Sequence, residues 1–446
     1  MEQWQKITVV TTVYAFFIEI KPLDQFLTAY LTGPDVNVSL AEVTNELTPT
    51  RVYLGLVSSA LAFLLSDYFL YKPVMVFSGL LGMLSFVNFA RSPSKLQLIF
   101  AESCLSLYFS VETTYYSYLY ASIKDKTHYQ LATGCAKAAM LTGTCVSGLL
   151  GQLVVYFGHG SYTALPYISL AGLTIAFAWA CFMPPVKFNN YFHVPVPEVP
   201  VSSKTALYDS AVPGYAGSAT TDRLPRKPKQ TSRLASALAC KYESLKLSYS
   251  DPVVLKWSFW YILSLGTYIE LLLNVNILLT YNADETNDRS MLLNGMVVSI
   301  MTLCGALSTY RIGKVDVDWD RCGDKFLGYG SLVLSMLTGL CCFTRNDYFV
   351  YVMLIGYGTL VQSMFVISIS ETAKRLQQNL YALVIGFNVF VAVSLATCFS
   401  VVVIEMNVFY TTVPQQFLFY GGLYLFMGII FISSSIVKSN NSRVLL

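Results

Sequence analysis

Charged residues are scarce in this chain: they make up 12% of its 446 residues, and only three histidines occur. A soluble domain typically contains about 25% charged residues, so the composition excludes an ordinary soluble protein. The ten cysteines include no Cys-x-x-Cys pair of the kind that holds zinc, and no nucleophile motif or phosphate-binding loop occurs. We therefore expect no catalysis, no bound metal and no cofactor. The small net charge of +3 gives no indication of a nucleic-acid partner.

Long apolar runs are what the sequence has instead. Hydrophobic residues account for 54% of the chain, and a helix needs about 20 predominantly apolar residues to cross a bilayer. We predict an all-α polytopic protein with twelve membrane spans, and we therefore expect the lipid bilayer to be one of its partners. The predicted spans lie at about 7–31, 52–71, 74–91, 97–122, 131–157, 164–183, 254–280, 291–310, 326–343, 348–371, 380–404 and 415–436.

The distribution of lysine and arginine supports this count, because cytoplasmic loops of membrane proteins are enriched in these residues. If both termini are cytoplasmic, most of the lysines and arginines fall in cytoplasmic loops. The first apolar run is too long for a cleavable signal and contains Lys21, Pro22 and Asp24, so we expect it to remain as the first span. The chain should therefore be a multi-pass protein with both ends inside the cell.

One long polar segment divides the predicted spans into two groups of six. Residues 184–252 contain a proline-rich stretch at 193–200, a middle rich in Ser, Thr and Gly, and a basic stretch at 223–233. Such a composition is typical of a disordered linker. We predict an N-terminal six-helix half over 1–183, a mostly disordered cytoplasmic linker over 184–252, and a C-terminal six-helix half over 253–446.

A few charged residues interrupt the predicted spans. Glu112 lies in the fourth span, Lys21 and Asp24 lie in the first, Glu270 lies in the seventh and Glu371 lies in the tenth. A charged group in hydrocarbon costs about 2.5–3.5 kcal/mol on insertion scales, and such residues usually face a water-filled path or a ligand. Carboxylates at this depth point to a transporter of a cationic or proton-coupled solute.

Seven short motifs, spread over nearly all of the predicted spans, carry a family resemblance. They are KPLDQFLTAYL at 21–31, ELTP at 46–49, DYFLYKP at 67–73, ETTYYSYLY at 112–120, WSFW at 257–260, NG at 294–295 and YALVIGFN at 381–388. Together they resemble the solute-carrier family that contains the reduced folate carrier and the thiamine transporters. The resemblance implies the major facilitator fold, in which two halves rock around a site near the bilayer midplane.

Within that family, the fourth span distinguishes thiamine carriers, which have Glu, from the folate carrier, which has Arg. Glu112 occupies that position here, so the resemblance implies a cationic substrate whose charge and amino group a carboxylate can bind. Tyr115 lies on the same helix face and should stack on the substrate ring. By the same resemblance, Asp24 is the second acidic contact, and Asn294 donates a hydrogen bond from the other half.

Three positions depart from the pattern of the thiamine carriers. Arg51 replaces a Trp at the start of the second span, and by this position we include it among the substrate-binding residues. Near a cationic substrate, we expect it to pair with Asp24 or to point outward. Glu270 and Glu371 each replace a Gln, which would favour a cation more strongly or provide a proton site. Glu371 lies three positions before Lys374, so a simple ion pair or a gate is an equal alternative there.

Lys21 is the one basic residue that we assign to the membrane interior. We expect it to be structural and to bond Asp24 or Glu19 rather than a cationic ligand. The alternative is that Lys21 pairs with Glu112 across the bundle, in which case Glu112 would also be structural.

Two loops carry further expectations. Asp67 and Lys72 lie in a loop where facilitators form a cytoplasmic gate, so we assign them to conformational change rather than to substrate contact. Asn37 begins an Asn-x-Ser acceptor on the external side and should be glycosylated. Asn440 begins a second such match, but it should be cytoplasmic and unmodified.

The sequence therefore predicts a monomeric secondary transporter of the plasma membrane that moves thiamine or a related cationic vitamin. A folate transporter is the alternative within transport, although Gly358 and Ala396 occupy positions where the folate carrier has cations. A vitamin receptor that binds without transport is the alternative of another class. Exchange of labelled substrate across vesicles would distinguish a transporter from a receptor.

Overall fold

The computed structural model describes most of the chain. The described residues are 2–34, 36–39, 42–66, 69–90, 93–109, 112–158, 161–186, 233–286, 294–344, 346–377, 380–405 and 412–444. All regular structure within these ranges is helical, and no strand occurs in them. The prediction of an all-α protein is therefore confirmed for the described residues.

The helices follow one another with short connections. In chain order they are α1 (Gln3–Phe17), α2 (Leu23–Thr32), η1 (Val43–Leu47), α4 (Thr48–Leu65), α5 (Lys72–Phe89), α6 (Lys95–Phe109), α7 (Glu112–Ser122), η2 (Lys126–His128), α8 (Tyr129–Phe157), α9 (Leu165–Phe182), α10 (Arg233–Tyr249), α11 (Pro252–Thr286), α12 (Asn294–Gly313), α13 (Trp319–Phe343), α14 (Asp347–Arg375), α15 (Tyr381–Phe399), η4 (Ser400–Glu405) and α16 (Val413–Val444).

Nine helices in the described ranges are long and apolar enough to cross a membrane. The other predicted spans are the first, second and fourth. The second corresponds to the shorter apolar helix α4, and the fourth is described as α6 followed by α7. The first is divided into α1 and α2, so the prediction of one continuous helix over 7–31 is wrong. Pro22 explains the break, because proline has no N–H and its ring excludes the preceding turn of a helix.

The break in the first span leaves backbone N–H groups that a membrane interior cannot hydrate. Two serines of neighbouring helices accept them. The N–H of Lys21 donates to Ser147 Oγ of α8 at 3.1 Å, and the N–H of Leu23 donates to Ser169 Oγ of α9 at 3.1 Å. The broken first span is therefore held in place by polar side chains that a continuous helix would not need.

The carbonyl groups at the break are also in close contact with neighbouring helices. Tyr108 of α6 donates its hydroxyl to the carbonyl oxygen of Ile18 at 2.5 Å. Gly172 of α9 lies so close to the break that a Cβ on it would overlap the carbonyl oxygen of Ile20. The sequence requires a glycine at this position because the backbone of the break occupies the space of a side chain.

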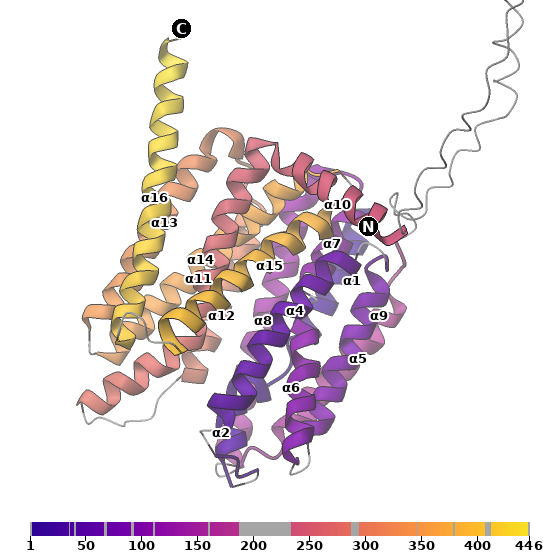
Figure 1. The fold of residues 1–446 in the computed structure, drawn as a ribbon, viewed down its shortest axis with the longest axis vertical. Coiled ribbons are helices and arrows are strands. Elements are labelled where there is room, and N and C mark those ends of the chain that lie inside the picture. The colour runs from indigo at the N-terminus through magenta and orange to yellow at the C-terminus, as the bar shows by residue number, and fades with distance from the viewer. Residues whose placement is uncertain are drawn as a thin grey trace, which may run out of the picture.

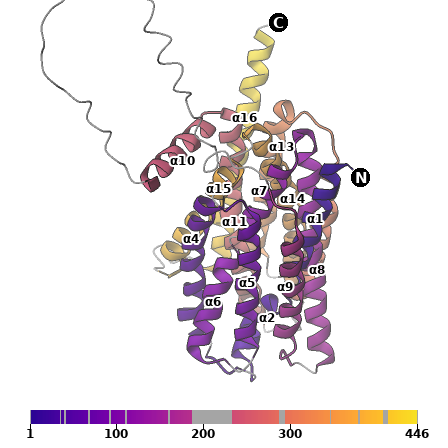
Figure 2. The ribbon, with the colours of Figure 1, turned by 90° about the vertical axis from the view of Figure 1, so that its right-hand side faces the viewer.

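The two groups of helices lie side by side (Figure 1). Helices α1 to α9, coloured indigo to magenta, form one side of the molecule, and α11 to α16, coloured pink to yellow, form the other. The chain ends marked N and C and the helix α10 lie at the same end in both views (Figures 1 and 2). We call this the N-terminal end of the bundle.

Between the two halves, α8 packs against α12 and α14, and α15 packs against α4 and α7. Glycines allow the closest of these approaches. A Cβ on Gly134 of α8 would lie 2.8 Å from the carbonyl oxygen of Thr309 and 2.9 Å from the Cα of Gly313, both in α12. Small residues at helix interfaces are the usual means by which membrane helices approach closely.

Helix α10 occupies the last part of the segment that we predicted to be a mostly disordered linker. Lys241 donates from its Nζ to the carbonyl oxygen of Leu64, at the end of α4. Tyr249 donates its hydroxyl to Asn388 Oδ1 of α15, and Asn388 in turn donates to Ser258 of α11 at 2.9 Å. This helix therefore contacts both halves, whereas residues 187–232 of the predicted linker lie outside the described residues.

Candidate functional site

Glu112 and Tyr115 lie in α7, as the fourth-span pattern predicts. Glu112 is the first residue of that helix, and its side chain lies outside the described part of the structure. Tyr115 is buried, its ring lies 6.4 Å from the ring of Tyr14 and 4.5 Å from that of Tyr116, and its hydroxyl donates to Met140 Sδ at 3.3 Å. The predicted stacking residue thus belongs to an aromatic cluster between α1, α7 and α8.

Lys21 pairs with Glu19 rather than with Asp24. Its Nζ lies 3.2 Å from Glu19 Oε2 and 5.1 Å from the centroid of the Tyr108 ring. Thr144 of α8 also donates to Glu19 Oε2 at 3.5 Å. Lys21 is only 5% exposed, so its charge is offset within the break of the first span.

Arg51 of α4 lies between two carboxylates. Its Nε donates to Glu102 Oε2 of α6 at 2.7 Å, and its Nη2 lies 4.0 Å from Asp24 Oδ1 of α2. Glu102 is 3% exposed. The sequence analysis did not single out Glu102, although an acidic residue inside a predicted span was the available signal. Its partner lies 51 positions earlier in the chain, so spacing alone could not identify the pair.

A second group of ion pairs, on the surface, joins α6 to η1 and to the residues just before it. Lys95 at the start of α6 lies 2.7 Å from Glu46 and 3.9 Å from Glu42. The side-chain and backbone hydrogen bonds with Ser39 hold the pKa of Glu42 below its ordinary value, and the nearby ammonium of Lys95 acts in the same direction. These residues lie at the end of the bundle opposite the N-terminal end, and the segment before η1 that contains Glu42 also contains the exposed Asn37.

Glu270 of α11 is buried in the second half and is 3% exposed. Ser400 donates to its Oε1 at 2.8 Å, and Asn274 donates to its Oε2 at 3.4 Å. Ser400 begins the π-helical turn η4, a conformation often found at functional sites. No basic residue in the described ranges pairs with Glu270, so its carboxyl group is held by neutral donors alone.

Tyrosines of α11, α14 and α16 form a network close to Glu270. Gln362 of α14 donates to the hydroxyl of Tyr268 at 2.9 Å, and the ring of Tyr268 stacks on that of Tyr357 at 6.3 Å. The hydroxyl of Tyr357 lies 2.9 Å from that of Tyr424. Gln362 Oε1 is buried and accepts no hydrogen bond from a described residue. Asn294 begins α12, and its side chain lies outside the described part.

The two halves are bonded to each other at the N-terminal end. Tyr129 of α8 and Tyr381 of α15 share a hydrogen bond of 2.8 Å between their hydroxyls. Lys126 donates from its Nζ to the carbonyl oxygens of Lys374 at 2.8 Å and Leu376 at 2.6 Å, where α14 ends. A cation at the last carbonyls of a helix also offsets the negative end of the helix dipole.

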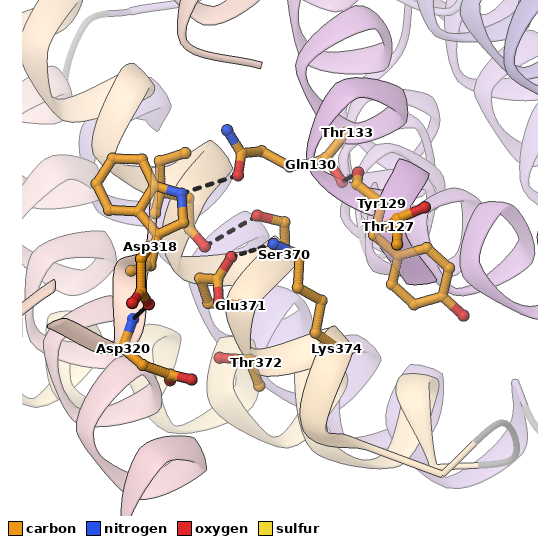
Figure 3. Close-up of polar contacts among 12 residues, drawn as sticks. Thr127, Tyr129, Gln130, Thr133, Asp318, Asp320, Ser370, Glu371, Thr372 and Lys374 are labelled. Carbon is orange, nitrogen blue, oxygen red and sulfur yellow. Dashed lines mark hydrogen bonds and ion pairs between the residues drawn. The ribbon is translucent and has the colours of Figure 1, made fainter. Parts of the chain in front are cut away.

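Gln130 makes a third bridge between the halves at the same end (Figure 3). It donates from Nε2 to the carbonyl oxygens of Ile312 and Val315, each at 2.8 Å. It also accepts from the indole N–H of Trp319 at 2.8 Å, the bond drawn at Gln130 in Figure 3. The three bonds connect α8 to the end of α12 and to the start of α13. The second half is therefore fastened to α8 by both side-chain and backbone groups.

Glu371 lies beside these bridges and is paired with a neighbour on its own helix. Lys374 donates to Glu371 Oε1 (Figure 3), and Arg375 binds both oxygens of Asp320, with the shorter contact at 2.5 Å. The ion pair that the spacing allowed is therefore present. Its location near the bridges places Glu371 at the N-terminal end and away from Glu270.

Lys72, which the sequence assigned to a gate, lies at the same end of the first half. It donates from Nζ to the carbonyl oxygen of Cys181 at 2.8 Å, near the end of α9. Its predicted companion Asp67 lies outside the described residues. The bond of Lys72 joins α5 to α9, so it stays within the first half.

Relatives of known name match nearly the whole chain. Human thiamine transporter 2 is 28% identical over 459 residues, which covers 99% of this chain and 92% of that protein. Human thiamine transporter 1 is 28% identical, with 98% of this chain and 90% of that protein covered. The human reduced folate transporter is 29% identical over 97% of this chain and 72% of its own length.

Structural comparison agrees with the predicted fold. The crystal structure of the human organic anion transporter MFSD10 matches with a TM-score of 0.67 and 13% identity, over 97% of this chain and 100% of that one. This likeness and the two groups of helices establish the major facilitator fold. The family model described as reduced folate carrier matches residues 2–419. The chain is thus a multi-pass membrane protein of the reduced folate carrier family.

Proposed function

We propose that this protein is a secondary transporter of the plasma membrane that carries thiamine or a related cationic vitamin by alternating access. The proposal places the N-terminal end of the bundle in the cytoplasm and takes the monomer as the working unit. The names of the thiamine transporters among its relatives support the substrate class. The charges inside the bundle provide independent support.

The balance of these charges is the observation that carries the proposal. Arg51 lies between two carboxylates, those of Asp24 and Glu102. Lys21 is offset by Glu19, and Glu270 has no basic partner among the described residues. The four carboxylates of Asp24, Glu102, Glu19 and Glu270 outnumber the cations of Arg51, Lys21 and the buried Lys137, which favours a positively charged substrate and disfavours a dianion such as folate.

The bridges at the N-terminal end support an alternating-access cycle in which the substrate enters from the opposite end of the bundle. Tyr129, Gln130 and Lys126 each bond across the two halves there. The ion pairs at the other end, such as Arg51 with Glu102 and Lys95 with Glu46, join helices of the first half only. This arrangement fits a conformation that is closed toward the cytoplasm and loads substrate from outside.

Uptake of labelled thiamine and labelled folate by cells that express the protein tests the proposal. We expect thiamine to accumulate and to be displaced by unlabelled thiamine at concentrations at which folate has no effect. Preferential uptake of folate would establish the alternative substrate. Vesicles preloaded with unlabelled thiamine should also exchange it for the labelled form, and binding without exchange would identify a receptor instead.

A further inference from the structure

Arg51 uses only part of its hydrogen-bonding capacity within the protein. A guanidinium group carries five N–H donors in a planar fork. Its Nε donates to Glu102 at 2.7 Å. Its Nη2 is buried and has no hydrogen-bond partner among the described residues. A buried donor without an acceptor is unfavourable, so an acceptor from a ligand would stabilise this arrangement.

Asp24 is the complementary group. Its Oδ1 lies 4.0 Å from Arg51 Nη2, which is too far for a direct hydrogen bond. Its carboxylate accepts no hydrogen bond from any residue in the described ranges, and its side chain is 23% exposed. The two groups therefore present one donor and one acceptor side by side, close enough for two adjacent atoms of a ligand to reach both.

We propose that Arg51 and Asp24 together recognise a planar edge of the substrate that carries a hydrogen-bond acceptor next to an amino donor. Asp24 accepts from the amino group, and Arg51 Nη2 donates to the adjacent ring nitrogen. An aminopyrimidine has such an edge, so this assignment rests on the proposed function and deepens it. Arg51 is then a specificity-determining residue.

Glu102 positions Arg51 for this role. It holds the guanidinium through Nε, and α6 fixes the backbone at the same point because Ser106 donates to the carbonyl oxygen of Arg51 at 2.6 Å. The charges of the three groups sum to −1, since two carboxylates accompany one guanidinium. A cationic substrate is therefore not repelled by the arginine that contacts it.

A tether between α4 and α6 is the simpler role for the pair of Arg51 and Glu102. A tether uses Nε and Oε2, and it leaves Nη2 and Asp24 without a function. The two roles differ in what a substitution changes. Loss of a tether lowers the amount of folded protein, whereas loss of a recognition group alters the choice between substrates that differ at one atom.

The test uses the double variant Arg51→Gln/Glu102→Gln, which removes both charges of the pair and leaves no buried ion alone. Competition for uptake is measured with thiamine and with an analogue in which carbon replaces the ring nitrogen beside the amino group. For the wild type, we expect the inhibition constant of thiamine to be about tenfold to a hundredfold lower than that of the analogue, because the analogue lacks one hydrogen bond to a charged group. The double variant should bring the two inhibition constants within about threefold of each other.

Two further variants complete the test. Lys95→Gln/Glu46→Gln removes an exposed ion pair between α6 and η1, the turn before α4, and it should keep the preference of the wild type. Asp24→Asn should weaken binding of thiamine and of the analogue by similar factors. An unchanged preference in the double variant, with protein at the cell surface, would overturn the role of Arg51 alone. A wild type that neither binds nor transports thiamine would overturn the proposed function and this inference together.

Discussion

The hydroxyl of Tyr129 lies 2.8 Å from the hydroxyl of Tyr381, although 252 positions separate the two residues. The bond joins α8 to α15 and so joins the two halves where the bundle is closed. Both residues are fully buried. A transport cycle that opens this end must break the bond.

Replacing Tyr129 or Tyr381 with Phe should favour opening toward the cytoplasm. One hydrogen bond of this kind contributes about 1 kcal/mol, which corresponds to a shift of about fivefold in the equilibrium between the two conformations. Labelling of a cysteine introduced next to Tyr381 by a reagent on the cytoplasmic side measures the shift. Tyr167→Phe removes a bond to Ala90 within the first half and should leave labelling unchanged. Equal labelling in all variants would contradict a gate at this pair.

Gly172→Ala should destabilise the protein because the new Cβ overlaps the carbonyl oxygen of Ile20. Overpacking of this kind costs about 1–3 kcal/mol, and the melting temperature in detergent should fall accordingly. Gly422→Ala in α16 is the matched control, since a Cβ there meets nothing within 4 Å. Alanine is the better helix former by about 1 kcal/mol, so the control should melt at the same or a higher temperature. A stable Gly172→Ala would show that the break of the first span is not held as described.

Glu112→Gln should abolish uptake of the cation and leave the protein at the cell surface. If Glu112 pairs with a buried cationic substrate, loss of its charge costs about 3–5 kcal/mol. Glu243→Gln on the exposed surface of α10 makes the same chemical change away from the site, and it should transport normally. Near-normal uptake by Glu112→Gln would exclude the assignment that the fourth span suggested.

Acid outside the cell should slow uptake if a proton and the cation compete for Glu270. Its oxygens accept from the neutral groups of Ser400 and Asn274, so protonation leaves no buried cation without a partner. Glu270→Gln should then flatten the dependence of the uptake rate on external pH. Glu371→Gln should keep the wild-type profile, because Glu371 is paired with Lys374 at the closed end. A wild-type rate that does not vary with pH would refute the competition.

Asn37 should carry a glycan, and Asn440 should not. Asn37 is exposed in the segment between α2 and η1, on the side that the proposed orientation places outside the cell. Treatment with a glycosidase should shift the wild type on a gel and leave Asn37→Gln unshifted, with Asn440→Gln behaving like the wild type. A remaining shift in Asn37→Gln would point to another external acceptor and to an error in the orientation.

The sequence predicted the features that depend on local patterns. Hydropathy predicted the helical fold, and unusual residues such as Glu270 and Glu371 were visible because they interrupt apolar runs. Partners distant in the chain were not predictable. Spacing offers no signal for the pairing of Arg51 with Glu102 or of Tyr129 with Tyr381, since helix packing alone brings these residues together. Glu19 and Asp24 both lie within three positions of Lys21, so the sequence did not distinguish between them as its partner. In the structure, Lys21 pairs with Glu19 within the break of the first span.

Helix α10 links the two halves, because it bonds a helix of each. Lys241 in the middle of α10 bonds the final turn of α4, and Tyr249 at the end of α10 bonds Asn388 of α15. If a rocking motion separates α4 from α15, one of these two hydrogen bonds has to break, while the other keeps α10 attached to one half. Whichever contact breaks first, its loss adds to the barrier of this step, so the segment that connects the halves would help to set the speed of the cycle.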